Sequence, residues 1–134
     1  RRTLKQTETT MEYRPLGQTD LHVSSIGLGC VTFGREIAAP DAFAVMDRAV
    51  ERGINLFDTA DSYGTGNGLD GRSEVLIGTF LRQCPSTKVD GVCVATKFAA
   101  YPWRITRESV VRAARDSSIP CSRRITTTGG SRAR

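Results

Sequence analysis

Three short apolar runs, each of strand length, alternate with three amphipathic helical patterns between residues 25 and 116. The runs lie at 25–28, 54–58 and 92–96, and the last is apolar on both faces, as in parallel strands covered by helices. Such alternation is typical of a parallel α/β sheet with right-handed crossovers. A complete eight-stranded α/β barrel takes about 250 residues, more than this chain has. We therefore expect about three βα units.

The limits of the first helix are indicated by its flanking residues. Pro40 suits the first helical position, where its missing N–H costs nothing, and Gly53 suits the C-terminal cap. Between them, Phe43, Met46 and Val50 recur at helical spacing and predict one apolar stripe.

Two further helices are predicted from caps and apolar pairs. Ser73, followed by Glu74, is the expected N-cap of a helix that runs to about Gln83. Thr106 is the expected N-cap of a helix over 107–116.

The two ends of the chain differ from this α/β portion, residues 11–116. Residues 1–10 are polar and without periodicity, so we expect an N-terminal extension. Two short runs at 12–16 and 21–23 flank a Gly-Gln-Thr-Asp turn and predict a β-hairpin. Residues 117–134 show no apolar periodicity, so we expect an irregular basic tail where a fourth strand would be due.

The net charge of +5 comes from those two ends. Residues 11–116 carry 12 basic and 13 acidic residues, whereas 117–134 hold four Arg and no acid. A nucleic-acid binder places its cations on a structured face, so we expect no nucleic-acid partner, with loose attraction by the tail left open. No apolar run reaches the roughly 18 residues of a membrane span, and no secretory signal is visible. We expect a cytoplasmic protein with no membrane partner.

The four cysteines do not form a metal-ligand pattern. None stands in a CxxC spacing, and the single histidine, His22, is not near any of them in the sequence. Cys93 lies inside an apolar run and is interpreted as a small core residue. We therefore expect no metal, and reduced thiols as in the cytoplasm.

Three polar side chains follow the predicted strands. Asp58 closes the second strand, Tyr63 lies in the loop after it, and Lys97 closes the third strand. The loops beyond the carboxyl ends of parallel strands form the functional face, and neighbouring strands run about 4.8 Å apart. We expect Asp58 and Lys97 to meet at this rim, within reach of Tyr63.

A phenol beside an ammonium group can act as an acid. Tyrosine, with an ordinary pKa near 10, is a poor acid at neutral pH, but an adjacent ammonium stabilises its phenolate. Lys97 is the candidate ammonium, Asp58 is the carboxylate that keeps it charged, and Tyr63 is the predicted general acid. Each residue alone also has a structural interpretation, as a cap, a packing residue or a solvated strand end. Their joint placement favours the functional interpretation.

Glycine-rich segments raise the alternative of a phosphate-binding loop. GLGCVTFG follows a strand but lacks the third glycine of GxGxxG, and the next helix begins only near Pro40. Dinucleotide binding of the Rossmann type needs a helix N-terminus directly after the turn. A compact three-stranded dinucleotide module is therefore the least favoured alternative.

Several segments match a known family when they are taken together. YRPLGQTDLHVSSIGLG, GINLFDTADSYG, SEVLIG and the ATK of the third strand follow in this order along about residues 13–116. The pattern resembles the N-terminal part of an aldo-keto reductase, a (β/α)8-barrel family that reduces carbonyls with NADPH. The resemblance implies the N-terminal part of a TIM barrel, with an N-terminal β-hairpin and about three βα units.

The resemblance also implies roles for the residues at the rim. Tyr63 would donate a proton, tuned by Lys97 and Asp58, while NADPH passes hydride to the carbonyl carbon of a small aldehyde or ketone. The cofactor-binding candidates near the nicotinamide and its ribose are Gly29, Cys30, Val31, Thr32 and Asp58. The candidates for the substrate mouth are Val31, Thr32, Phe33 and Trp103, the last being equally a packing residue.

The sequence departs from the family after Asp116. The family's fourth catalytic residue, a histidine after the fourth strand, has no counterpart, and His22 precedes the first strand. We therefore expect a truncated or frameshifted form that by itself binds NADPH weakly and turns over no aldehyde. Because the family includes barrels that serve as channel subunits, the alternative is a non-catalytic interaction or subunit protein.

Overall fold

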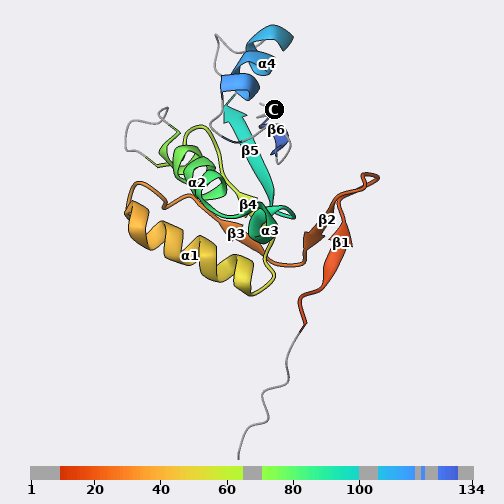
Figure 1. The fold of residues 1–134 in the computed structure, drawn as a ribbon. Coiled ribbons are helices and arrows are strands. Elements are labelled where there is room, and N and C mark those ends of the chain that lie inside the picture. Colours follow the sequence, from red (N-terminus) through yellow and green to blue (C-terminus); the bar gives the residue numbers. More distant parts are fainter. Residues whose placement is uncertain (1–9, 65–70, 100–105, 117–118, 120–123, 130–134) are drawn as a thin grey trace, which may run out of the picture.

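A two-stranded hairpin and a four-stranded parallel sheet make up the strands of this computed structural model (Figure 1). The structure describes residues 10–64, 71–99, 106–116, 119 and 124–129. The elements are β1 (Tyr13–Pro15), β2 (His22–Ser24), β3 (Gly27–Gly29), α1 (Ala39–Glu51), β4 (Leu56–Asp58), α2 (Arg72–Gln83), α3 (Ser86–Val89), β5 (Cys93–Ala99), α4 (Arg107–Asp116) and β6 (Arg124–Gly129). The parallel sheet has the order β3-β4-β5-β6, so the partial α/β architecture with an N-terminal hairpin is confirmed.

The hairpin is attached to the amino-terminal end of the sheet through Asn55, the residue before β4. The Asn55 side chain accepts the backbone N–H of Ser24 at 2.7 Å and donates to the carbonyl of His22 at 2.9 Å. The backbone N–H of Asn55 donates to Ser24 Oγ at 3.1 Å. Three hydrogen bonds therefore hold β2 against the start of β4.

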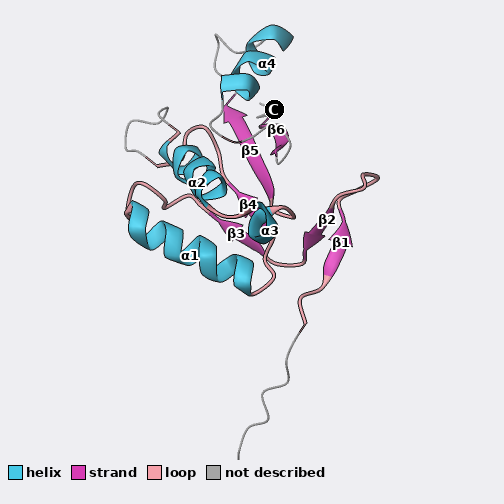
Figure 2. Cartoon of the chain, in the orientation of Figure 1, coloured by secondary structure: helices cyan, strands magenta, loops and turns pink. Residues whose placement is uncertain are grey.

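The two faces of the sheet carry different residues because successive side chains along a strand point to opposite sides. Leu28, Phe57 and Val94 are in register across β3, β4 and β5 and pack under α1 and α2, which cover this face (Figure 2). The buried core residues are Cys30, Phe33, Ala42, Met46, Ala49, Phe57, Ile77, Phe80, Leu81, Val89, Val92, Val94 and Ile119. The opposite face carries small or polar residues near the carboxyl end of the sheet.

The first helix follows its prediction closely. α1 has Pro40 in its first turn, and Gly53, with φ of +83°, follows the C-cap residue. The buried positions of α1 are Ala42, Met46 and Ala49, while Phe43 and Val50 are partly buried against the same core. The buried stripe is therefore rotated by about one residue from the prediction.

The last helix also has the predicted bounds. Thr106 caps α4, since its Oγ1 accepts the backbone N–H of Ser109 at 3.2 Å. The short helix α3 was not predicted, because four residues are too few to show a period. No helix in the described ranges is long and apolar enough to cross a membrane.

The expectation of an irregular tail over 117–134 is wrong for residues 124–129. These residues form β6, which pairs in parallel with β5 from Val94↔Arg124 to Ala99↔Gly129. The segment RITTTG contains four consecutive β-branched residues, which favour strands, and β5 offers it an open edge. The strand was missed because this run shows none of the apolar continuity of the other strands.

Candidate active site

The sheet itself brings the predicted site residues to one rim. Gly29, Asp58 and Ala95 are in register across β3, β4 and β5. Lys97 lies two residues beyond Ala95 and therefore on the same face as Asp58. β5 runs on to Ala99, so Lys97 lies within the strand and not at its end.

Asp58 and Lys97 form an ion pair at this rim. Lys97 Nζ lies 2.7 Å from Asp58 Oδ1, and the two side chains are 36% and 51% exposed. Exposed ion pairs of this kind contribute only about 0–1 kcal/mol to stability. The main consequence of the pair is therefore the position of a cation at the rim, since its contribution to stability is small.

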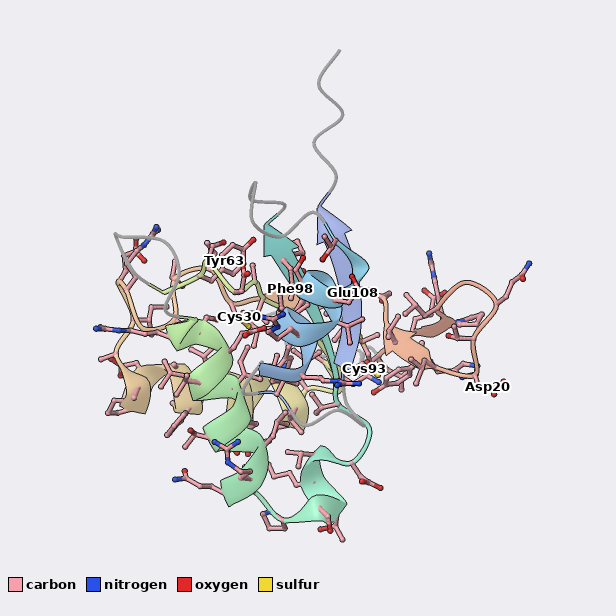
Figure 3. The ribbon with its side chains drawn as sticks, turned by 90° about the horizontal axis from the view of Figure 1, so that it is seen from above. Asp20, Cys30, Tyr63, Cys93, Phe98 and Glu108 are labelled. Atoms are coloured by element: carbon pink, nitrogen blue, oxygen red, sulfur yellow. The ribbon has the colours of Figure 1, made fainter. Side chains whose placement is uncertain are left out.

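Tyr63 completes the predicted group of three. Lys97 Nζ lies 5.1 Å from the centroid of the Tyr63 ring, within the range of cation–π attraction. The backbone fixes the loop, since Tyr63 N–H donates to the Ala60 carbonyl at 3.1 Å and Asp61 N–H donates to the Lys97 carbonyl at 3.0 Å. In Figure 3, Tyr63 and Cys30 are labelled close to each other and far from the hairpin residue Asp20. The ammonium thus contacts the aromatic ring.

Gly64 allows the chain to turn sharply behind Tyr63. Its φ of +108° lies in the region that favours glycine. A Cβ at this position would lie 2.7 Å from Arg72 Cβ and 2.8 Å from the Phe33 carbonyl oxygen. The close approach lets the Tyr63 loop pack directly against α2 and the loop after β3.

The loop after β3 borders open space next to Asp58. A Cβ added to Gly29 would meet no heavy atom within 4 Å, so a flat ring has room beside the carboxylate. Cys30 is fully buried, and its backbone N–H donates to the Asp58 carbonyl at 2.9 Å. Burial, and secondarily the charge of Asp58, raises the pKa of the Cys30 thiol to about 12. The thiol therefore stays neutral.

The remaining cofactor and substrate candidates divide into three groups. Val31 is 43% exposed, and the Thr32 carbonyl accepts three backbone N–H groups of the following turn. Phe33 is 1% exposed and belongs to the core, so its side chain packs and does not line an open mouth. Trp103 lies outside the described residues.

Two further predictions concern His22 and the alternative of a Rossmann-type turn after the first parallel strand. His22 lies in β2, attached to the amino-terminal end of the sheet, and so does not join the three site residues. α1 begins at Ala39, ten residues after β3 ends at Gly29, which does not match a Rossmann turn.

The prediction that Ser73 caps α2 is wrong. The N-cap is Gly71, with φ of +53°, and the fully buried Ser73 hydroxyl donates to the Cys30 carbonyl at 2.8 Å instead. A second hydrogen bond of 2.9 Å joins the hydroxyls of Ser73 and Thr59. A serine at the start of a helix resembles a cap in sequence, and only the fold reveals partners from other loops.

A comparison with family models matches residues 25–121 to the aldo/keto reductase family. The chloroplastic pyridoxal reductase of Arabidopsis thaliana is 45% identical over 106 aligned residues, and the match covers 72% of this chain and 29% of that protein. The uncharacterized oxidoreductase YrpG of Bacillus subtilis is 41% identical over 87 residues, covering 65% of this chain and 26% of YrpG. The chain thus spans less than a third of the length of these curated relatives.

Solved structures give the same picture of the fold. A Pseudomonas aeruginosa protein described as an aldo-keto reductase matches with a TM-score of 0.60 and 34% identity, over 82% of this chain and 44% of that one. A Bacillus halodurans aldo-keto reductase in its holo form matches with a TM-score of 0.53 at 21% identity, over 89% of this chain and 51% of that one. The second likeness concerns the fold alone.

Proposed function

The chain belongs to the aldo/keto reductase family, and from this we infer that its rim supplies the proton-donating part of an NADPH-dependent carbonyl reductase. Tyr63 is the proton donor, Lys97 is the cation beside it, and Asp58 holds that cation in place. The reaction is the reduction of a small aldehyde or ketone to an alcohol. Because the chain spans less than a third of its curated relatives, this activity is proposed for a complete barrel that contains the segment.

The observation that carries the proposal is the contact between three side chains that lie far apart in the sequence. Lys97 lies 2.7 Å from the Asp58 carboxylate and 5.1 Å from the centre of the Tyr63 ring. Two of the three, Asp58 and Lys97, are separated by 39 residues. A cation next to a phenol favours its phenolate form and so helps the phenol to act as a general acid.

Each residue has a defined task in this proposal. Tyr63 donates its hydroxyl proton to the carbonyl oxygen as that oxygen gains negative charge. The Lys97 ammonium stabilises the phenolate that remains on Tyr63. The Asp58 carboxylate keeps the Lys97 ammonium at the rim by a charge-assisted hydrogen bond.

The open space next to Gly29 fits the nicotinamide end of the cofactor. Gly29 and Asp58 are the residues that would hold it, since a Cβ at Gly29 would meet no heavy atom within 4 Å. Members of this family use nicotinamide cofactors, and we propose NADPH for this chain. When bound there, the nicotinamide supplies the hydride that reduces the carbonyl carbon.

A transplanted segment tests this proposal. Residues 13–116 replace the aligned segment of the Arabidopsis pyridoxal reductase, and the oxidation of NADPH or NADH is followed with pyridoxal and a panel of aldehydes. We expect aldehyde-dependent oxidation of NADPH, with NADH oxidised more slowly. A chimaera that folds by circular dichroism and yet reduces no aldehyde in the panel would contradict the proposal.

A further inference from the structure

The Ser73 hydroxyl lies directly behind the rim and takes no part in the proton transfer proposed above. Ser73 is at 0% exposure, and so is its partner Thr59. Its hydroxyl has one proton, which is donated to the Cys30 carbonyl at 2.8 Å. The 2.9 Å bond between the two hydroxyls must therefore be donated by Thr59 and accepted by Ser73.

The three partners of Ser73 come from three segments of the site. The Cys30 carbonyl follows β3, Thr59 is the residue after Asp58, and the Tyr63 carbonyl accepts the backbone N–H of Ser73 at 3.2 Å. One residue of α2 is thus bonded to the loop that carries the acid and to the residue next to the carboxylate. It fastens both of them to the end of β3.

The next residue of α2 makes a similar contact to the third strand. The buried Glu74 carboxylate accepts the Thr96 hydroxyl at 2.5 Å, and Thr96 immediately precedes Lys97. The first turn of α2 is therefore hydrogen-bonded to the neighbour of Lys97 as well as to the Tyr63 loop. A displacement of this turn would change the position of Tyr63 relative to Lys97.

We propose that Ser73 is a positioning residue that holds the Tyr63 ring against the Lys97 ammonium, through its hydroxyl bonds to Cys30 and Thr59 and its amide bond to Tyr63. Its importance for catalysis rests on the function proposed above. The positioning itself is a property of the folded chain and can be measured without turnover.

Ser24 provides a matched control for a general loss of stability. It is also buried, at 3% exposure, and its hydroxyl also makes two hydrogen bonds, to the Ile26 carbonyl at 2.7 Å and from Asn55 N–H at 3.1 Å. Ser24 lies at the hairpin end of the sheet, away from the Tyr63 loop. Ser24→Ala and Ser73→Ala thus each remove a buried, doubly hydrogen-bonded hydroxyl, at opposite ends of the parallel sheet.

The test uses the chain labelled with ¹³C at lysine Cε. The sequence has three lysines, Lys5, Lys88 and Lys97, so the spectrum is simple, and Lys97→Arg assigns the signal of interest. Protons above an aromatic ring are shifted upfield, and protons near its edge show nuclear Overhauser effects to the ring protons. In the unsubstituted chain we expect both signatures between Lys97 and Tyr63, and Tyr63→Leu should abolish them.

In Ser73→Ala we expect the Lys97–Tyr63 Overhauser effect to be lost and the Lys97 signal to move toward its position in an unfolded peptide. The signal of Lys88, which lies in α3 and pairs with Asp47 of α1, should keep its chemical shift. Ser24→Ala should leave both signals unchanged. Ser73→Cys, which keeps a weak donor of similar shape, should restore part of the Lys97 shift.

Two results would overturn the proposal. One is a Ser73→Ala chain with Lys97 and Tyr63 signals like those of the unsubstituted chain. The other is an equal change in Ser24→Ala and Ser73→Ala, which would reveal only a loss of stability. If Ser73→Ala does not fold, Ser73→Cys is compared with the unsubstituted chain: a Lys97 signal moved part of the way toward its unfolded-peptide position supports the proposal, and an unmoved signal overturns it. Since these signals do not depend on aldehyde reduction, failure of the proposed function would appear separately, in the chimaera assay.

Discussion

The two ends of the parallel sheet are built from similar polar groups that are used differently. At the amino-terminal end, the Asn55 side chain makes two hydrogen bonds to the backbone of β2, and the Asn55 N–H donates to the Ser24 hydroxyl. At the carboxyl end, Asp58 and Lys97 pair with each other at 51% and 36% exposure, next to Tyr63. At the amino-terminal end the polar groups are bonded within the protein, whereas at the carboxyl end an ion pair is exposed to solvent beside the partly buried Tyr63.

This difference indicates where stability and chemistry reside. The hydrogen bonds of Asn55 are part-buried or exposed, and each such bond contributes about 0.5–1.5 kcal/mol to stability. An exposed ion pair is worth little to the fold. Substitutions at the amino-terminal end should therefore lower stability, and substitutions at the rim should lower activity.

The largest effect is expected from Tyr63→Phe. Removing the proposed general acid should lower the turnover of the chimaera by about 10²- to 10⁴-fold, the usual contribution of such a group. NADPH binding and the thermal midpoint should stay nearly unchanged, because the phenyl ring keeps its packing. Steady-state kinetics measure the turnover, and a fluorescence titration with NADPH measures the cofactor affinity. Undiminished turnover would remove Tyr63 from its assigned role.

A substitution at the amino-terminal end of the sheet, Asn55→Ala, should lower the stability of the chain and leave its activity unchanged. It removes the side-chain partner of the Ser24 N–H and of the His22 carbonyl, one bond part-buried and the other exposed, at a cost of about 0.5–1.5 kcal/mol per bond in the free energy of unfolding. Urea unfolding of the chain measures this loss. Turnover per folded chimaera should be unaffected, and a loss of turnover without a loss of stability would contradict the comparison.

A smaller effect, confined to alkaline pH, is expected from Cys30 under the rim. Burial raises the pKa of its thiol from the ordinary 9.0 to about 12, so the unfolded chain loses this proton first as the pH rises. The free energy of unfolding should consequently fall between pH 9 and about 12. Cys30→Ala should show a shallower decline in urea unfolding at pH 8, 9 and 10. Identical slopes for both chains would show that the thiol is not shielded.

The smallest effect is expected from an ion pair that belongs to neither kind of site. Glu12 and Arg14 of the hairpin are 3.1 Å apart and 63% and 67% exposed. Arg14 lowers the pKa of Glu12, but so exposed a pair is screened by solvent. Glu12→Gln should leave the unfolding midpoint within experimental error. The matched variant Glu36→Gln, in the loop after β3, should also keep its unfolding midpoint. A marked fall of the midpoint in either variant would show that exposed ion pairs contribute more to stability than expected.

Much of the fold could be predicted because periodicity and caps are local properties. The bounds of α4 and the cap at Thr106 followed from a few neighbouring residues. β6 could not be predicted in this way, since its strand conformation depends on the open edge of β5 and not on an apolar run.

The same distinction holds for the site. The pairing of Asp58 with Lys97 was predictable, because parallel strands place their carboxyl ends together. The role of Ser73 was not, since its partners Cys30 and Thr59 come from other loops. Phe33 looked accessible in a loop sequence, but the turn after β3 directs it into the core.

A double-mutant cycle on turnover tests most directly whether Tyr63 and Lys97 act as one proton-donating unit. The rate of NADPH oxidation is measured for the chimaera, Tyr63→Phe, Lys97→Met and the double variant, with Lys88→Met as the control lysine. If the ammonium works through the phenol, the double variant should lose no more activity than Tyr63→Phe alone. Losses that multiply would mean that Lys97 and Tyr63 act independently and not as one unit. A Lys88→Met loss equal to that of Lys97→Met would mean that the loss is not specific to the rim.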